Sequence, residues 1–337
     1  MAKVAGVHGR PRRQRGARGG GRGRDCKRGR ASGTSESPRD NRPMPPVALA
    51  LVLAAALLHA TWNIAAKKAG GGDAFVLMTS VMVGVIWAPV ALGLGFGELV
   101  GWGAREWGFA IASAVVHLVY FRTLLRGYRE ADLTVVYPVA RGSGPLVTVV
   151  AAIVLLGEPL TAGGALGALA VCTGVFVLAG GPRLWQGGGD AAARARMLAG
   201  LRWGALTGAG IAAYSVLDGY AVKVVAMSPI LLDWLSQLLR APFLLPGQWR
   251  DRAGFLAAWR AQWKYALVGA LLSPVAYVMV LYAVELAPLS HVAPAREVSM
   301  LFAALLGGRL LGESDRGLRL AGAALIAAGV WSLARAG

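Results

Sequence analysis

Two arginines are the residues of this sequence whose chemistry is easiest to name. Arg141 and Arg296 each lie eight residues inside a long apolar segment, where an ionised side chain is costly and normally faces polar groups or water. A guanidinium group holds a carboxylate or a phosphate through two parallel hydrogen bonds. Tyr137 precedes Arg141 by one helical turn, on the same helix face. This pattern favours a binding site for a small anionic or zwitterionic solute.

Other polar side chains recur at helical spacing within apolar segments. His59, Asn63 and Lys67 share one helix face, and Trp62 and Tyr214 occupy roughly equivalent places in two segments. The expected substrate-binding residues are Arg141, Arg296, Tyr137, Trp62, Asn63 and Tyr214. The alternative for these side chains is packing and hydrogen bonding between helices.

Titratable groups in the same segments are candidates for proton coupling or gating, because burial disfavours the charge of a carboxylate and a nearby arginine favours it. These candidates are His59, Asp218, Glu285 and Asp233. Asp233 also shares a helix face with Gln237 and Arg240. In the alternative interpretation the charges neutralise one another. The pairs would then be Arg296 with Glu297 or Glu285, and Arg141 with Asp218 or Asp233.

The elements that must position these groups are helices that cross a membrane. From Val47 onwards the chain contains ten apolar segments, each close to the length of about 20 residues that a spanning helix needs. The expected spans are 47–67, 74–95, 107–125, 133–155, 163–181, 201–220, 229–246, 265–284, 288–307 and 318–334. A composition of 56% apolar and 15% charged residues agrees with a polytopic membrane protein.

The ten segments form two sequence-related sets of five. The sequence LLGE at 155–158 recurs at 310–313, and the same offset of 155 residues aligns Arg141 with Arg296 and Gly167 with Gly322. Because five is odd, the second set enters the membrane in the opposite direction from the first. The predicted fold class is therefore an all-α integral membrane protein with ten transmembrane helices in a 5+5 inverted repeat.

The chain divides into four regions by composition. Residues 1–45 are rich in arginine and glycine and are predicted to form a disordered tail. Met44, near the end of this tail, is the candidate for the true start of the protein. Residues 46–182 are the first repeat, 183–200 a polar linker and 201–337 the second repeat. The tail has no apolar core of its own before the first span and is therefore no signal peptide.

Enzyme and metal motifs are missing from the sequence. Cys26 and Cys172 are too far apart to suggest a disulfide framework or a metal site. No histidine–glutamate zinc motif, phosphate-binding loop or nucleophile elbow is present. We expect no catalytic residue, no metal, no cofactor and no nucleic-acid partner.

Four stretches resemble a known family: HATWN at 59–63 followed by Lys67, ADLTVVYP at 131–138, and the two LGE endings. With them the chain resembles the drug/metabolite transporter superfamily, specifically the ten-helix proteins with two EamA-like domains. The resemblance covers essentially everything after Met44. It implies a secondary carrier with a central cavity between the two halves.

We therefore expect a carrier of small organic metabolites, such as amino acids or organic acids, that works by alternating access. It would lie in the inner (plasma) membrane as a monomer or homodimer, coupled to protons or a counter-substrate. Two alternatives stay open: a flippase for a lipid-linked substrate, and a membrane enzyme acting on a phosphorylated lipid. The enzyme would need a nucleophile or base beside the arginines, and no cluster at fixed spacing supplies one.

Overall fold

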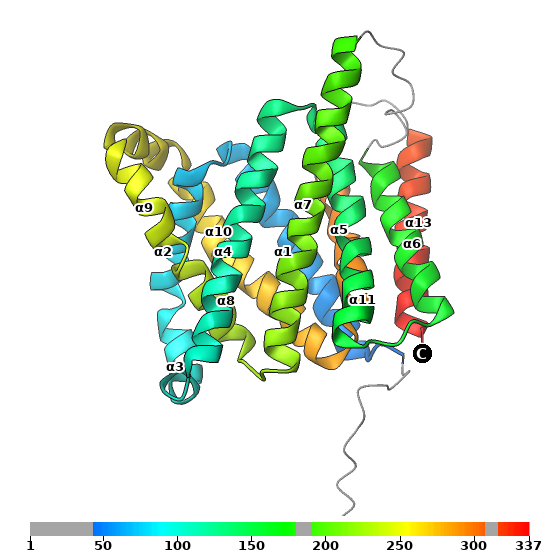
Figure 1. The fold of residues 1–337 in the computed structure, drawn as a ribbon, viewed down its shortest axis with the longest axis horizontal. Coiled ribbons are helices and arrows are strands. Elements are labelled where there is room, and N and C mark those ends of the chain that lie inside the picture. Colours follow the sequence, from blue (N-terminus) through cyan, green and yellow to red (C-terminus); the bar gives the residue numbers. More distant parts are fainter. Residues whose placement is uncertain (1–42, 180–190, 307–315, 337) are drawn as a thin grey trace, which may run out of the picture. The chain divides into compact units, whose positions relative to one another are not determined.

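The fold is built from helices joined by short turns (Figure 1). The structure is a computed structural model that describes residues 43–179, 191–306 and 316–336. Within these ranges the helices are α1 (Pro46–Ala69), α2 (Asp73–Ile86), α3 (Ala88–Val100), α4 (Ala104–Glu130), α5 (Leu133–Leu156), α6 (Ala162–Leu178), α7 (Ala191–Lys223), α8 (Pro229–Leu238), α9 (Ala241–Arg250), α10 (Arg252–Leu286), α11 (Leu289–Ala295), η2 (Arg296–Val298), α12 (Ser299–Leu306) and α13 (Arg316–Arg335). The all-α class predicted from the sequence is confirmed.

Two of the expected continuous spans are broken where a proline begins the next helix. Residues 74–95 belong to α2 and α3, which meet near Trp87 with a bend of 66°. Pro89 stands in the first turn of α3, where the missing amide hydrogen has no intrahelical acceptor to lose. Pro242 takes the same place in α9, after α8 has ended at Leu238.

The ninth expected span is also interrupted. It consists of α11, the short 3-10 turn η2 and α12 in succession. Pro294 lies in the last turn of α11, where it removes one helical hydrogen-bond donor. The interruption places Arg296 and Glu297 on a tight turn rather than on a regular helix. In contrast, α5 continues through Pro138 and Pro145.

Several helices are suited to a bilayer by length and composition. Four meet both criteria, namely α1, α4, the Val135–Leu156 part of α5, and α10, and the bent α2–α3 pair makes a fifth. The apolar helices α6 and Leu320–Arg335 are shorter. Fewer helices of the described ranges pass than the ten spans expected: breaks shorten some apolar runs, α6 has only 17 residues, and the unbroken α7 is not among those that pass. The described ranges therefore contain several helices that could cross a bilayer.

The start of α7 extends into the predicted linker. This helix begins at Ala191, ten residues before the expected sixth span. The sequence from there to Gly200 contains alanine, arginine, methionine and leucine, which all favour helix. The first part of the linker and the basic tail up to residue 42 lie outside the described residues.

Glycines bring α6 and α13 into close contact. A Cβ atom added to Gly167 would lie 2.8 Å from the carbonyl oxygen of Gly329, and one added to Gly174 would lie 2.7 Å from that of Gly322. The earlier glycine of α6 faces the later glycine of α13, so the two helices run antiparallel. Small residues allow such close packing where lipid supplies no hydrophobic drive for helix association.

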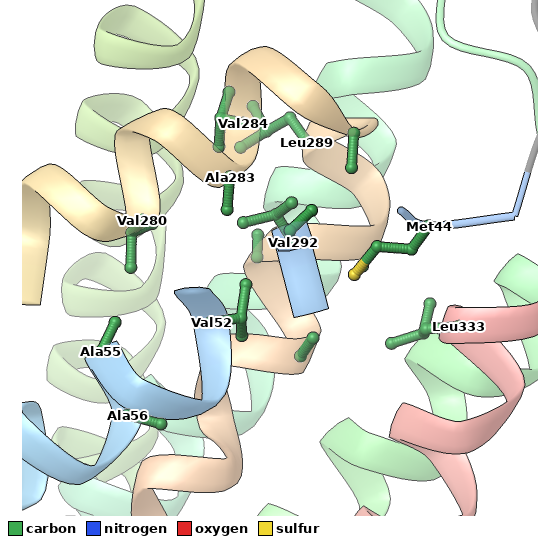
Figure 2. Close-up of a cluster of buried hydrophobic side chains, with 14 of the residues drawn as sticks. Met44, Val52, Ala55, Ala56, Val280, Ala283, Val284, Leu289, Val292 and Leu333 are labelled. Carbon is green, nitrogen blue, oxygen red and sulfur yellow. The ribbon is translucent and has the colours of Figure 1, made fainter. Parts of the chain in front are cut away.

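A cluster of small and branched apolar side chains joins α1 to the second repeat. The part of it labelled in Figure 2 comes from residues before and within α1 and from α10, α11 and α13, and the cluster also includes residues of α5, α6, α7, α8 and α12. Figure 2 labels Met44, Val52, Ala55, Ala56, Val280, Ala283, Val284, Leu289, Val292 and Leu333. All of them are buried, so α1 is packed firmly against helices that follow 200 residues later.

Glu158 ties the loop after α5 to the second repeat. Its Oε1 accepts hydrogen bonds from the backbone amide of Leu289 at 2.7 Å and from Lys223 Nζ at 3.1 Å, and its Oε2 accepts from the amide of Ser290 at 2.8 Å. Burial alone would raise the pKa of Glu158, but Lys223 and the two amides outweigh burial and lower that pKa. The repeat-related Glu313 lies outside the described residues.

Candidate functional site

A single carboxylate lies between the two arginines. Arg141 Nη1 is 3.5 Å from Glu297 Oε2, and Arg296 Nε is 3.9 Å from Glu297 Oε1. Arg296 is 5% exposed and Glu297 is fully buried. Arg141 comes from α5 and the other two from η2, so both repeats contribute. These three residues are called the arginine centre. Two guanidiniums against one carboxylate leave one excess positive charge, which suits an anionic group.

The pairing corrects one expectation from the sequence. Arg296 does contact Glu297, one of the two partners considered for it. The partners considered for Arg141 were Asp218 and Asp233, but within the described ranges its ion pair is with Glu297. The 3-10 turn explains the difference, because it brings Glu297 within reach of α5 as well as of its own neighbour.

A tyrosine accompanies each arginine. The Arg141 guanidinium lies 5.8 Å from the ring centre of Tyr137, and that of Arg296 lies 5.7 Å from the ring centre of Tyr214. Arg296 Nη2 also donates to the Tyr214 hydroxyl at 3.3 Å, and the Tyr137 hydroxyl donates to Met300 Sδ at 3.1 Å. The expected neighbours Tyr137 and Tyr214 therefore flank the arginine centre.

The polar face of α1 is turned toward the same region. His59 lies within electrostatic reach of both Arg296 and Arg141. Its ring contacts that of Trp62 edge to face, with centroids 5.1 Å apart, and Asn63 Nδ2 donates to the His59 carbonyl at 2.7 Å. His59 Nδ1 and Trp62 Nε1 are buried without a hydrogen-bond partner among the described residues. The α1 face thus offers two unused polar atoms beside the arginines.

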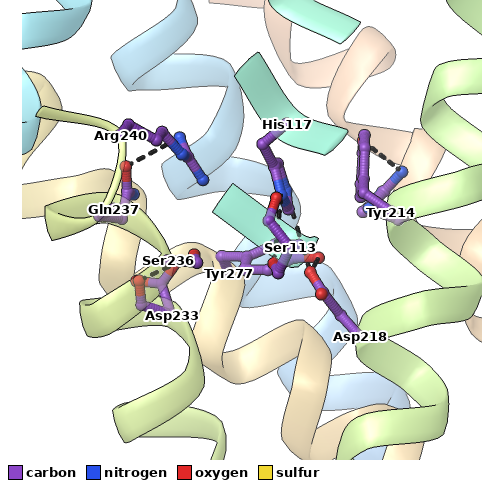
Figure 3. A network of polar contacts seen from close by, with 10 residues as sticks. Ser113, His117, Tyr214, Asp218, Asp233, Ser236, Gln237, Arg240 and Tyr277 are labelled. Atoms are coloured by element: carbon purple, nitrogen blue, oxygen red, sulfur yellow. Dashed lines mark hydrogen bonds and ion pairs between the residues drawn. The ribbon is translucent and has the colours of Figure 1, made fainter. Parts of the chain in front are cut away.

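A second polar group surrounds Asp218 (Figure 3). The Tyr277 hydroxyl donates to Asp218 Oδ2 at 2.6 Å, and His117 Nε2 is 3.9 Å from the same oxygen. The other ring nitrogen of His117 is 2.9 Å from the Ser113 carbonyl. Stacking of His117 on Tyr214, with ring centroids 4.3 Å apart, connects this group to the arginine centre.

Asp233 and Arg240 lie on the other side of Tyr277 in the view of Figure 3. Arg240 Nη1 donates to Gln237 Oε1 at 3.0 Å, and Ser236 Oγ donates to the Asp233 carbonyl at 3.0 Å. Asp233 and Gln237 lie one turn apart on α8, whereas Arg240 follows the end of this helix at Leu238, so the single helix face predicted for the three residues is only partly present. Asp218, Asp233 and Arg240 are called the aspartate centre.

One candidate is not brought to either centre. Glu285 is exposed in the last turn of α10, close to Leu286 where this helix ends. By contrast Arg296 and Tyr277 line a small hollow with Ser215, Val280, Leu281, Val284, Leu289, Val292 and Ala293. The hollow extends from the start of α11 to the arginine centre.

Three residues in or beside the two centres were missed or only partly predicted from the sequence. Tyr277 stands in an apolar run of α10 and carried no signal beyond its type, and His117 was not among the residues expected at the site. Glu297 was considered as a partner of Arg296 alone. A charged residue directly after an arginine inside an apolar segment was the available signal for its wider role.

The two centres consist of groups that can bind a polar solute. No group of three or more histidine, cysteine or carboxylate side chains suited to a metal ion occurs in the described ranges. Guanidiniums, phenols and carboxylates in contact offer charge and hydrogen bonds to a polar solute.

Comparison with known proteins decides the family. The profile of the EamA-like transporter family matches residues 46–180 and again residues 198–335. The chain belongs to the EamA-like transporter family. The two matches agree with the two EamA-like domains expected from the sequence, and the EamA-like chain is therefore a multi-pass protein of a membrane transporter superfamily.

The other comparisons give information on the fold only. No curated protein gives a significant sequence match. One solved structure, titled only as the crystal structure of a protein, superimposes with a TM-score of 0.65 at 19% sequence identity. The match covers 85% of the EamA-like chain and 96% of the other. At that identity the likeness concerns the path of the backbone.

Proposed function

We propose that this protein is a secondary carrier of small organic metabolites that bear an acidic group, such as amino acids or organic acids. The substrate's acidic group would bind at the arginine centre, and alternating access would expose this centre to each side of the membrane in turn. Both repeats supply residues to it, as expected for a site between two halves that move relative to each other.

The observation that carries the proposal is the unequal charge of the arginine centre. Arg141 and Arg296 share the single carboxylate of Glu297 at 3.5 and 3.9 Å, distances at the long end of the range for ion pairs. Each guanidinium has donors left over, since it carries five N–H groups. A substrate carboxylate or phosphate could complete both sets of hydrogen bonds. Tyr137, Tyr214, Trp62, Asn63 and His59 would form the rest of the wall.

Coupling to protons or to a counter-substrate is part of the proposal. His59, Asp218 and Asp233 are the groups we assign to it, because they are charged or titratable and lie around the two centres. Glu285 is left out because it is exposed at the end of α10. The membrane would be the inner (plasma) membrane of the cell.

The test is thermal unfolding of the purified protein with amino acids, organic acids, phosphorylated metabolites, sugars and cationic drugs added separately. We expect one or more acidic compounds to raise the midpoint of unfolding. Arg141→Gln and Arg296→Gln should each weaken the apparent affinity for that compound by about tenfold or more, equivalent to one lost charge-assisted contact.

Arg122→Gln is the matched control, because Arg122 is half exposed and pairs with Asp73 away from both centres. It should leave the ligand response unchanged. If acidic ligands stabilise the Arg141 and Arg296 variants as well as the parent, or if only cations bind, the proposal is wrong. A ligand that passes the test is then tried as a substrate in proteoliposomes.

A further inference from the structure

Two charged groups of the aspartate centre lie inside the protein without an ion-pair partner. Asp233 is 2% exposed, and its Oδ2 has no hydrogen-bond partner among the described residues. Arg240 Nε is also buried and unpartnered, and no ion pair joins it to Asp233 within those residues. Charges at such positions normally pair, because an uncompensated one costs several kcal/mol. This pair is close enough to interact electrostatically but is not in contact.

Asp218 has the same property. It is 1% exposed, Tyr277 and His117 face its Oδ2, and the Ser113 side chain lies near the carboxyl, while its Oδ1 has no hydrogen-bond partner of good geometry in the described chain. Arg240 is within electrostatic reach of this carboxylate too. Two buried carboxylate oxygens, from α7 and α8, are therefore available to a donor that this chain does not itself supply.

The two centres have opposite excess charge. The arginine centre has two guanidiniums and one carboxylate, whereas the aspartate centre has two carboxylates and one guanidinium. Tyr214 and His117 stack between them, since Tyr214 contacts Arg296 and His117 faces Asp218. The interior is neutral as a whole when all six groups are ionised, but its charge is separated into a positive and a negative side.

We propose that the aspartate centre is a second subsite, which binds the protonated amino group of a substrate whose acidic group lies at the arginine centre. The inference rests on the proposed function and narrows its substrates to zwitterions. An ammonium group carries three donors and no acceptor, which matches the free oxygens of Asp218 and Asp233. Arg240 offsets part of the negative charge of the two carboxylates, and its guanidinium donates to Gln237 Oε1.

The test compares matched pairs of ligands by thermal unfolding of the full-length protein. The amino acids run from glycine through 4-aminobutanoate to 6-aminohexanoate. Leucine and phenylalanine are added because they carry bulky apolar side chains. Each is paired with the carboxylic acid that lacks only the amino group. We expect one or more amino acids to bind about tenfold more tightly than the matching acid. The chain length that binds best then reports the separation of the two subsites.

Variants of Asp233 in α8 and of Arg240 just after this helix give opposite expectations. Asp233→Asn should abolish the preference for the amino compound while leaving the affinity for the matching acid unchanged. Arg240→Gln removes the cation that competes with the ammonium group, so it should widen the preference. Ser236→Ala is the matched control, because Ser236 is buried on the same helix and bonds only to a backbone carbonyl among the described residues.

The outcomes separate this inference from the proposed function. If no acid, with or without an amino group, stabilises the protein, both fail. If acids bind in an arginine-dependent manner but the amino group adds nothing, the carrier proposal stands and the second subsite is wrong. The proposal of a second subsite is also wrong if Asp233→Asn keeps the preference for the amino acid over the matching acid. Asp233 would then be assigned to proton binding alone.

Discussion

The ion pairs in the interior and those near the surface both join a guanidinium to a carboxylate, but they differ in their exposure to water. Around Glu297 the side chains of Arg141, Arg296 and the glutamate are 15%, 6% and 1% exposed. Nearer the surface, Arg122 Nη2 lies 3.0 Å from Asp73 Oδ2, and these side chains are 50% and 37% exposed. The exposed pair is the shorter one. Removing one partner of the exposed pair should still lower the free energy of unfolding less than removing one of the buried pair. Water takes the place of the missing partner at the surface, and nothing takes it in the interior.

Glu297→Gln should have the largest effect, because it leaves two buried guanidiniums without a counter-charge. We expect the free energy of unfolding to fall by about 3 kcal/mol or more. Denaturant titration of the purified protein in micelles measures it. Adding Arg141→Met to this variant should restore part of the loss, since one uncompensated charge is removed. A loss under about 1 kcal/mol would show that water reaches the arginine centre.

Glu158→Gln should come next. The carboxylate is 9% exposed and accepts from two backbone amides and a lysine, and an amide side chain satisfies only part of that set. We expect a loss of about 2 kcal/mol in the same titration. An unchanged free energy of unfolding would mean that the tie between the α5–α6 loop and α11 does not contribute to stability.

The same residue predicts a dependence on pH. The folded-state pKa of Glu158 is lower than the unfolded value, so its contribution is complete above the ordinary glutamate pKa of about 4.3 and disappears as the pH falls through the lowered folded value. The difference in unfolding midpoint between parent and Glu158→Gln should therefore be constant near neutral pH and shrink in acid. A difference that grows in acid would contradict the sign.

Lys223→Met should cost less than either glutamate change. Lys223 is 25% exposed, and removing it leaves Glu158 with both backbone amides. We expect about 1 kcal/mol, within the range for a partly exposed pair. The double variant Lys223→Met with Glu158→Gln tests the coupling, since the two losses should not add.

Asp73→Asn should have the smallest effect. Both partners of this pair reach water, so the expected loss is about 0.5 kcal/mol or less, and it should vanish in high salt. A loss of unfolding free energy comparable with that of Glu297→Gln would show that exposed and buried ion pairs contribute equally to stability.

The sequence predicted the fold class and the neighbourhood of the arginines because both follow from one-dimensional patterns. Apolar runs give helices, and the repeat gives Arg141 and Arg296 equivalent places. Tyr137 follows from helical spacing alone. Those inferences need no knowledge of how one helix is rotated against another.

The partners of these residues depended on such rotation and were harder to predict. Whether Arg141 meets Asp218, Asp233 or Glu297 is decided by the turn η2, which exists because Pro294 interrupts the ninth segment. Breaks at Pro89 and Pro242 were also read as continuous helix, since a proline in a first turn and a proline inside an apolar run look alike in sequence.

The glycine contact between α6 and α13 has the form of an interface between identical molecules. Gly167 meets Gly329 and Gly174 meets Gly322, while the repeat aligns Gly167 with Gly322 and Gly174 with Gly329. Gly167 thus touches the counterpart of Gly174, and Gly174 touches the counterpart of Gly167, which is the rule for a two-fold homodimer. A separate five-helix protein would carry this surface ready-made. Joining two copies into one gene then frees each to change alone, and the one-sided aspartate centre is something that two identical copies could not build.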